Sequence, residues 1–147
     1  MIANADELRI FAYDHLAANG FPPTLSEIGR HFGMTRPAAR EELAALKIGK
    51  TILLHPESGE IWMAGPFSWI RTDYEVVSGG RTYWANCWWD MLGIPMILNA
   101  PAQAHTKCTD CGSPMTIECD PSHPPTDDAV VHFLVPARHW YDDIGFT

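Results

Sequence analysis

Apolar and polar positions in the first third of the chain follow helical spacing. From Asp6 to Ala18 the apolar residues recur every three or four positions, which places them on one face of a helix. Thr24 and Glu27 have the spacing of a capping box, so a second helix begins there and breaks at Gly33. We expect three helices, over Asp6–Ala18, from Thr24 to about Phe32, and after Thr35, which is a candidate N-cap.

The pattern then changes to short segments rich in β-branched and aromatic residues, separated by turn-forming residues. Two such segments flank His55–Glu60 and predict a β-hairpin. Ser78-Gly79-Gly80 predicts a tight turn between two further strands. We expect strands at Thr51–Leu54, Ile61–Met63, Thr72–Val77, Arg81–Trp84, Gln103–Lys107, Pro114–Glu118 and Ala129–Val135, a connection at Gly65–Ser68, a loop at Asp120–Thr126, and a turn or short helix at Pro136–Asp143.

These elements predict an α+β protein in two parts. Residues 1–64 form a winged-helix-like three-helix module, and residues 65–147 form a mixed or antiparallel β core with short helices. A winged helix often binds DNA, but a reading helix needs basic and amide side chains directed at phosphates and bases. The third helix is nearly balanced in charge, which favours a packing module or lid; it carries Arg36, Arg40 and Lys47 beside Glu41 and Glu42.

Composition narrows the class of protein. The chain has 147 residues, 46% of them hydrophobic, and a formal net charge of −8, which makes nucleic acid an unfavourable partner. No apolar run has the length of a membrane span, and the first residues lack the pattern of a secretory signal. We therefore expect a cytoplasmic protein whose four cysteines are reduced thiols rather than a disulfide framework.

The stretch from Arg81 to Leu98 carries the strongest candidate chemistry. If Trp84–Leu92 is helical, Cys87 and Asp90 share one face, and Gly93 and Pro95 end the segment. Aromatic neighbours would exclude water, raise the pKa of Asp90 and form a pocket; these are Trp84, Trp88 and Trp89. A thiol beside a carboxyl can bind a soft metal and transfer a proton. The alternative is a buried, inert cysteine and a helix-capping carboxylate.

A second cysteine pair, Cys108-x-x-Cys111-Gly, resembles half of a zinc knuckle. Structural zinc needs four ligands, and no second pair is present, although Cys119, His105, His123 and His132 could complete a site. Thioredoxin-type chemistry would need a helix N-terminus, whereas this pair lies between two predicted strands. The pattern favours a turn with one buried thiol.

With these residues identified, most of the chain resembles the organomercurial (alkylmercury) lyases. The most specific element is Tyr-x-x-x-Cys-x-x-Asp-x-Leu-x-x-Pro, within R-T-Y-W-A-N-C-W-W-D-M-L-G-I-P. The resemblance extends to L-A-A-N-G-F-P-P-T-L-S-E-I-G-R-H-F-G, H-T-K-C-T-D-C-G-S-P-M-T-I and V-V-H-F-L-V-P.

The resemblance implies protonolytic cleavage of a carbon–mercury bond without a cofactor. It makes Cys87 the first thiolate and Asp90 the proton shuttle, both next to the mercury of the substrate and product. The implied partners are a small organomercurial, cellular thiols and a mercury-reducing enzyme that accepts Hg(II). The resemblance gives Cys108 a structural role.

The family's second catalytic cysteine is expected just after Thr147, so the core looks cut short. Three alternatives stay open. Cys111 or Cys119 could replace the missing thiol, the protein could bind or sense mercury or zinc without turnover, or it could act on another substrate.

Overall fold

The computed structural model describes residues 5–46, 52–123 and 132–143. Three helices form the N-terminal part, as predicted: α1 (Ala5–Asn19), α2 (Leu25–Phe32) and α3 (Arg36–Leu46). The predicted capping box is present, because the Thr24 hydroxyl accepts the N–H of Glu27 at 3.2 Å and the Glu27 carboxylate accepts the N–H of Thr24 at 2.7 Å. Gly33 ends α2 with a φ of 66°, a left-handed conformation that glycine adopts without steric cost. Lys47, expected on α3, lies outside the described residues.

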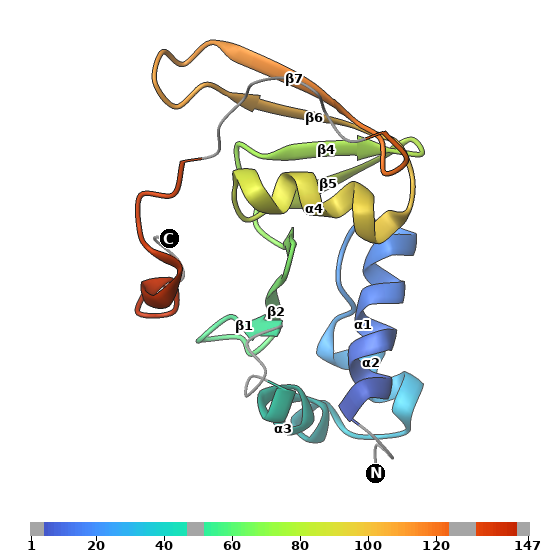
Figure 1. Cartoon of the computed structure of the whole chain (residues 1–147). Coiled ribbons are helices and arrows are strands. Elements are labelled where there is room, and N and C mark those ends of the chain that lie inside the picture. The colour runs from blue at the N-terminus through green and yellow to red at the C-terminus, as the bar shows by residue number, and fades with distance from the viewer. Residues whose placement is uncertain (1–4, 47–51, 124–131, 144–147) are drawn as a thin grey trace.

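All the strands of the described chain join one antiparallel sheet with the order β1-β2-β3-β5-β4-β6-β7. This confirms an α+β protein with an antiparallel sheet. Helix α4 packs beside the central strands, α1 and α2 lie alongside the β1–β2 hairpin, and α3 lies at the end away from α4 (Figure 1). The strands are β1 (Ile52–Leu54), β2 (Ile61–Ala64), β3 (Phe67–Ser68), β4 (Glu75–Ser78), β5 (Arg81–Ala85), β6 (Ala102–Lys107) and β7 (Pro114–Cys119).

The predicted connection at Gly65–Ser68 is wrong in its second half. Phe67 and Ser68 form β3, which pairs with β2 on one side and β5 on the other. A strand of two residues is too short to show alternation in the sequence. The sheet therefore runs without a break across the predicted boundary between residues 64 and 65, and the division into two domains stays a prediction.

The predicted strand at Ala129–Val135 is wrong in its described part, since His132–Val135 are not in a strand. Aromatic stacking takes the place of sheet pairing: the ring of Phe133 lies 5.2 Å from that of Trp140. The indole N–H of Trp140 donates to the carbonyl of Val135 at 2.8 Å. A 3₁₀ turn, η2 (Ala137–His139), follows where a turn or short helix was predicted.

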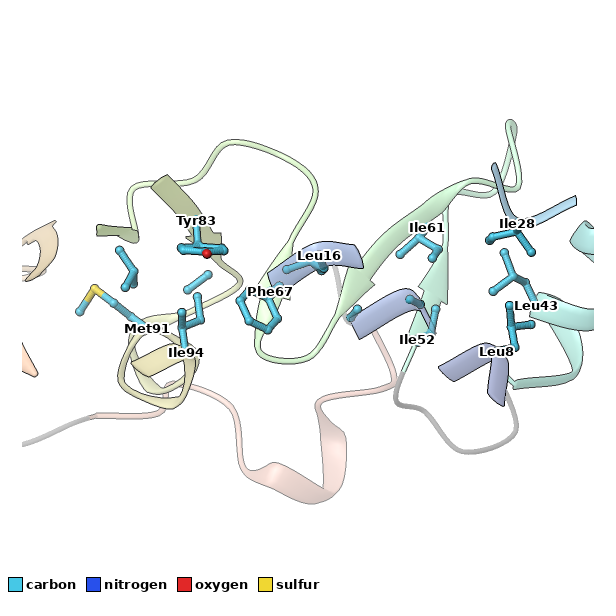
Figure 2. Packing of buried hydrophobic residues seen from close by; sticks show 14 of the residues in the cluster. Leu8, Leu16, Ile28, Leu43, Ile52, Ile61, Phe67, Tyr83, Met91 and Ile94 are labelled. Carbon is cyan, nitrogen blue, oxygen red and sulfur yellow. The ribbon is translucent and has the colours of Figure 1, made fainter. Parts of the chain in front are cut away.

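The hydrophobic core is continuous from the helices to the sheet. Figure 2 shows Leu8, Ile28 and Leu43 packed between the helices, followed by side chains of the β1–β2 hairpin. Leu16 and Phe67 then bridge this cluster to Tyr83 and to the buried face of α4. The hydroxyl of Tyr83 donates to the carbonyl of Ala17 at 2.9 Å, which ties β5 to α1. No helix within the described ranges has both the length and the apolar character needed to cross a membrane.

Candidate functional site

Cys87 and Asp90 meet at the start of helix α4 (Trp88–Leu98), directly after β5. The prediction that Trp84–Leu92 is helical is wrong at its beginning, because Trp84 and Ala85 belong to β5. Cys87 is the N-cap, with an extended backbone (φ −151°, ψ 179°), and its carbonyl accepts the N–H of Met91 at 3.0 Å. An N-cap residue and the third helical residue lie over the same first turn. The thiol and the carboxyl therefore come together through capping geometry rather than by sharing a helical face.

Helix α4 also continues past its predicted end. Pro95 lies inside the helix, which runs to Leu98 and ends at Asn99 with a φ of 48°. Proline removes one helical hydrogen bond. Burial compensates for this loss, since Met91, Ile94 and Pro95 all face the core. Pro95 does disfavour the helix locally, but tertiary packing of the buried face of α4 outweighs that cost.

Asn86 holds the carboxyl of Asp90 in place. Its side-chain amide donates to Asp90 Oδ2 at 3.0 Å and to the carbonyl of Pro66 at 3.1 Å. The carbonyl of Phe67 is a third, longer acceptor at 3.4 Å. Asn86 Oδ1 is buried and has no hydrogen-bond partner among the described residues. Asn86 thus links the entry of β3 to the candidate site.

Tyr13 of α1 also reaches this region. Its hydroxyl donates to the carbonyl of Gly65 at 2.8 Å, next to the cis peptide bond between Gly65 and Pro66. Burial raises the pKa of Tyr13, the positive charge of Arg9 lowers it, and the negative charge of Asp90 raises it. We did not predict a role for Asn86 or Tyr13. The position of Asn86 beside Cys87 could have indicated it, whereas no local pattern points from Tyr13 to a residue so distant in sequence.

The electrostatics of the site raise the pKa of both acids above their ordinary values. Burial raises the pKa of Asp90, and hydrogen bonds from Asn86 and Cys87 partly offset that rise. Burial also raises the pKa of the Cys87 thiol; the backbone N–H of Asp90 lowers it, and the Asp90 charge raises it again. A thiol and a carboxyl this close together, both half-buried, can exchange one proton.

The three tryptophans predicted to wall the site have different surroundings. Trp84 stacks under the guanidinium of Arg71, which lies 5.2 Å from its ring centre. Trp88 is half-buried against the core, and Trp89 is 58% exposed, with its ring 6.2 Å from that of Phe133. A shared apolar pocket stays a prediction.

The remaining cysteines occupy two other places. Cys108 is half-buried and Cys111 exposed on the turn between β6 and β7, whereas Cys119 is buried at the end of β7. The hydrogen bond to Ser113 lowers the pKa of Cys111, and a hydrogen bond with Cys108 lowers it further. Burial raises the pKa of Cys119, and the charge of Glu118 adds to this.

Strand register separates Cys119 from Cys87. Cys119 of β7 pairs with Ala102 of β6. The next residue of β6, Gln103, pairs with Val77 of β4. Val77 pairs on its other side with Thr82, at the start of β5. Cys87 follows the other end of β5, about 16 Å further along at 3.3 Å per residue. This register disfavours Cys119 as a second catalytic thiol.

The described residues do not support a zinc site. Within them, no group of three or more His, Cys, Asp and Glu side chains is arranged to hold a metal ion. His105 hydrogen-bonds Thr116 at 3.1 Å, and His123 hydrogen-bonds Asp120 at 2.9 Å. These histidines have other partners than the cysteine pair.

Comparisons with known proteins agree with the resemblance seen in the sequence. The family model described as alkylmercury lyase matches residues 67–146, a range that contains both Cys87 and Asp90. The crystal structure of the mercury-bound form of MerB2 has a similar fold, with a TM-score of 0.59 and 22% sequence identity. That similarity covers 76% of this chain and 55% of the other, so the chain spans little more than half the length of that protein. None of the curated proteins matches the chain.

Proposed function

The chain belongs to the alkylmercury lyase family, and from that premise we propose that it cleaves carbon–mercury bonds by protonolysis. The products are a hydrocarbon and Hg(II), and the substrate is a small organomercurial. One observation carries the proposal: within the matched residues, the Cys87 thiol and the Asp90 carboxyl lie close enough for each to shift the pKa of the other, and burial raises the pKa of both.

The first step is capture of the organomercurial by sulfur. Mercury is soft, so a thiolate is its preferred ligand. As the Cys87 sulfur bonds to mercury, the thiol proton passes to the Asp90 carboxylate. The other ligand that mercury carries in the substrate, opposite the carbon, leaves as an anion. The closeness of the two side chains provides the path for this proton.

The second step is proton delivery to carbon. A second thiolate, supplied by a monothiol from solution, adds to mercury and increases the electron density on the bound carbon. Asp90, now a carboxylic acid, gives its proton to that carbon, and the carbon–mercury bonding pair becomes the new carbon–hydrogen bond. The hydrocarbon leaves, Asp90 is again a carboxylate, and Hg(II) is held between Cys87 and the second thiolate. External thiols then remove the metal ion.

Burial explains why an aspartate suits this task. A carboxyl with an ordinary pKa would be a weak carrier near neutral pH, because it gives up its proton to water too readily. The raised pKa of Asp90 keeps the captured proton on the carboxyl for longer. Asn86 donates to Oδ2 and so restrains the orientation of the carboxyl.

The test is release of hydrocarbon. The purified chain is incubated with a phenylmercury salt and excess monothiol, and benzene is measured in the headspace by gas chromatography. We expect benzene above the thiol-only background, and only background from Cys87→Ser. Cys119→Ala is the matched control and should retain activity, since the strand register places Cys119 at the other end of the sheet. An unchanged rate in Cys87→Ser would overturn the proposal, and mercury retention without benzene would favour binding without turnover.

We further propose that the N-terminal helices and the β1–β2 hairpin form a winged-helix-like support rather than a DNA reader. The Arg36 guanidinium pairs with the Glu60 carboxylate at 2.9 Å. The side chain of Arg40 packs over Gly59, where an added Cβ would lie 2.5 Å from its Nε. Two of the basic residues of α3 thus contact the hairpin, which leaves them less available to phosphates.

A further inference from the structure

The turn between β6 and β7 holds two cysteines in contact. The N–H of Cys108 donates to the carbonyl of Ser113, and the N–H of Gly112 donates to the carbonyl of Cys108, both at 2.8 Å. Gly112 has a φ of 72°, which allows the chain to turn back tightly. The Cys108 thiol is close enough to lower the pKa of the Cys111 thiol. The backbone therefore brings the two sulfurs together before any ligand arrives.

The pair is also open to solvent. Cys111 is exposed, and its thiol donates to the hydroxyl of Ser113 at 3.1 Å. Cys108 is half-buried. Neither sulfur takes part in the Cys87–Asp90 site.

From these contacts we propose that Cys108 and Cys111 form a second metal site, which binds one soft, two-coordinate cation such as Hg(II). The described chain offers this pair no third or fourth ligand, so it does not meet the tetrahedral requirement of zinc. Hg(II) is satisfied by two thiolates. The exchange is balanced: Hg(II) bound by two monothiolates passes to the two cysteines, and both cysteine protons go to the released monothiols. Nothing is oxidised or reduced.

Two sulfurs on one turn hold the ion better than two separate thiols. Once the first cysteine has bound, the second faces the metal at an effective concentration in the millimolar range or above. A monothiol in solution must compete with this intramolecular ligand. The pair should therefore keep Hg(II) under conditions that remove it from a single cysteine.

The register of the sheet places this pair at the same end as Cys87. Glu75 of β4 pairs with Trp84 on one side and with His105 on the other. Cys87 comes three residues after Trp84, and Cys108 comes three residues after His105. The two segments leave the sheet at one end, about 10 Å apart laterally, since one strand lies between them. Figure 1 shows the β6–β7 turn and the beginning of α4 toward the same end. The pair is thus placed to receive Hg(II) from Cys87, a role that rests on the proposed function.

Metal retention tests the site without any cleavage reaction. Reduced Cys87→Ser protein is mixed with one equivalent of mercuric chloride and excess glutathione, desalted, and weighed by native mass spectrometry. We expect one mercury per chain. The variants Cys87→Ser/Cys111→Ser and Cys87→Ser/Cys108→Ser should retain at least about tenfold less, and Cys87→Ser/Cys119→Ala should retain as much as the parent. Circular dichroism verifies folding. Retention that survives loss of Cys111, or no retention in the parent, overturns the proposal.

Transfer of the product is tested in the full chain. In Cys111→Ser we expect an unchanged single-turnover release of benzene and a several-fold slower steady state when external thiol is limiting. An unchanged steady state overturns the receiving role. If the unaltered chain releases no benzene, the proposed function fails, whereas mercury retention by the Cys87→Ser protein still decides the metal site.

Discussion

The two thiol sites of this chain lie at one end of the same sheet and differ in almost every other respect. Cys87 is half-buried at a helix N-terminus beside a carboxyl, and burial raises its pKa. Cys111 is exposed on a hairpin turn, and the hydrogen bond to Ser113 lowers its pKa. The first thiol keeps its proton until a soft metal displaces it. The second is closer to being a thiolate before any metal is present.

This difference shows that the side chains next to a cysteine decide its chemistry. Both residues have a neighbouring side chain within hydrogen-bonding reach, but the neighbour of Cys87 is acidic and that of Cys111 is a hydroxyl. A negative neighbour disfavours the thiolate, whereas a hydroxyl that accepts from the thiol can turn and donate to the thiolate, which favours it. A site that must move a proton needs the first arrangement, whereas a site that only binds metal benefits from the second.

The largest expected effect comes from removing the proton carrier. In Asp90→Asn we expect benzene release to fall by about 10² to 10⁴-fold, the usual contribution of a positioned general acid. Mercury binding at Cys87 should persist, because the thiol remains. The measurement is single-turnover benzene release beside mercury retention.

Asp73→Asn is the matched control for this variant, since the Asp73 carboxylate is exposed and pairs only loosely with Lys107 at 3.7 Å. If both variants cleave at the rate of the unaltered chain, Asp90 does not carry the proton and the distinction between the two sites is lost.

The next largest effect is a difference in alkylation rate. At pH 7 we expect iodoacetamide to modify Cys111 several-fold faster than Cys87, because the lowered pKa and the exposure of Cys111 give it the larger accessible thiolate fraction. The raised pKa of Cys87 means that its rate keeps rising above about pH 8.5, the ordinary value for a thiol, while that of Cys111 levels off below it. Peptide mapping by mass spectrometry gives both rates in one sample. Equal rates at pH 7 would contradict the assigned environments.

A smaller effect is expected at Asn86. Asn86→Ala removes the donor to Asp90 Oδ2 and leaves the carbonyl of Pro66 without that partner. We expect a loss of stability of about 1 to 3 kcal/mol, measured by urea denaturation, and a further rise in the pKa of Asp90. Alkylation of Cys111 should not change. A variant as stable as the unaltered chain would show that the amide is not needed to join β3 to the site.

The smallest effect is expected at Ser113, and it tests the environment of Cys111. Ser113→Ala removes the hydroxyl that lowers the pKa of Cys111, so its alkylation at pH 7 should slow by a few-fold. Cys87 should react as before. Should Cys111 be unaffected, its reactivity would come from exposure alone.

Local signals in the sequence predicted much of this fold. The Thr24–Glu27 capping box and the helical spacing before it depend on residues within a few positions of each other, and both are present in the structure. The contact of Cys87 with Asp90 was also predicted, although from a helical face rather than from a cap. The same spacing of three residues serves both geometries, so the sequence could not distinguish them.

Features decided by distant contacts could not be predicted in this way. Phe67 and Ser68 form a strand only because β2 and β5 flank them. Pro95 stays in a helix because the core buries its turn. Tyr13 donates to Gly65, 52 residues away in the sequence, and no periodicity indicates such a contact.

The continuity of the sheet has a consequence for how the protein could be divided. The family match begins at Phe67, yet this residue pairs with β2 and packs in one cluster with Leu16 of α1. A fragment that began there would expose an unpaired strand edge and the ring of Phe67, both of which promote aggregation. The residues that the family model matches are therefore fewer than those that must be expressed to obtain a folded chain. The thiol chemistry has to be studied in the longer chain, which includes α1 and β2.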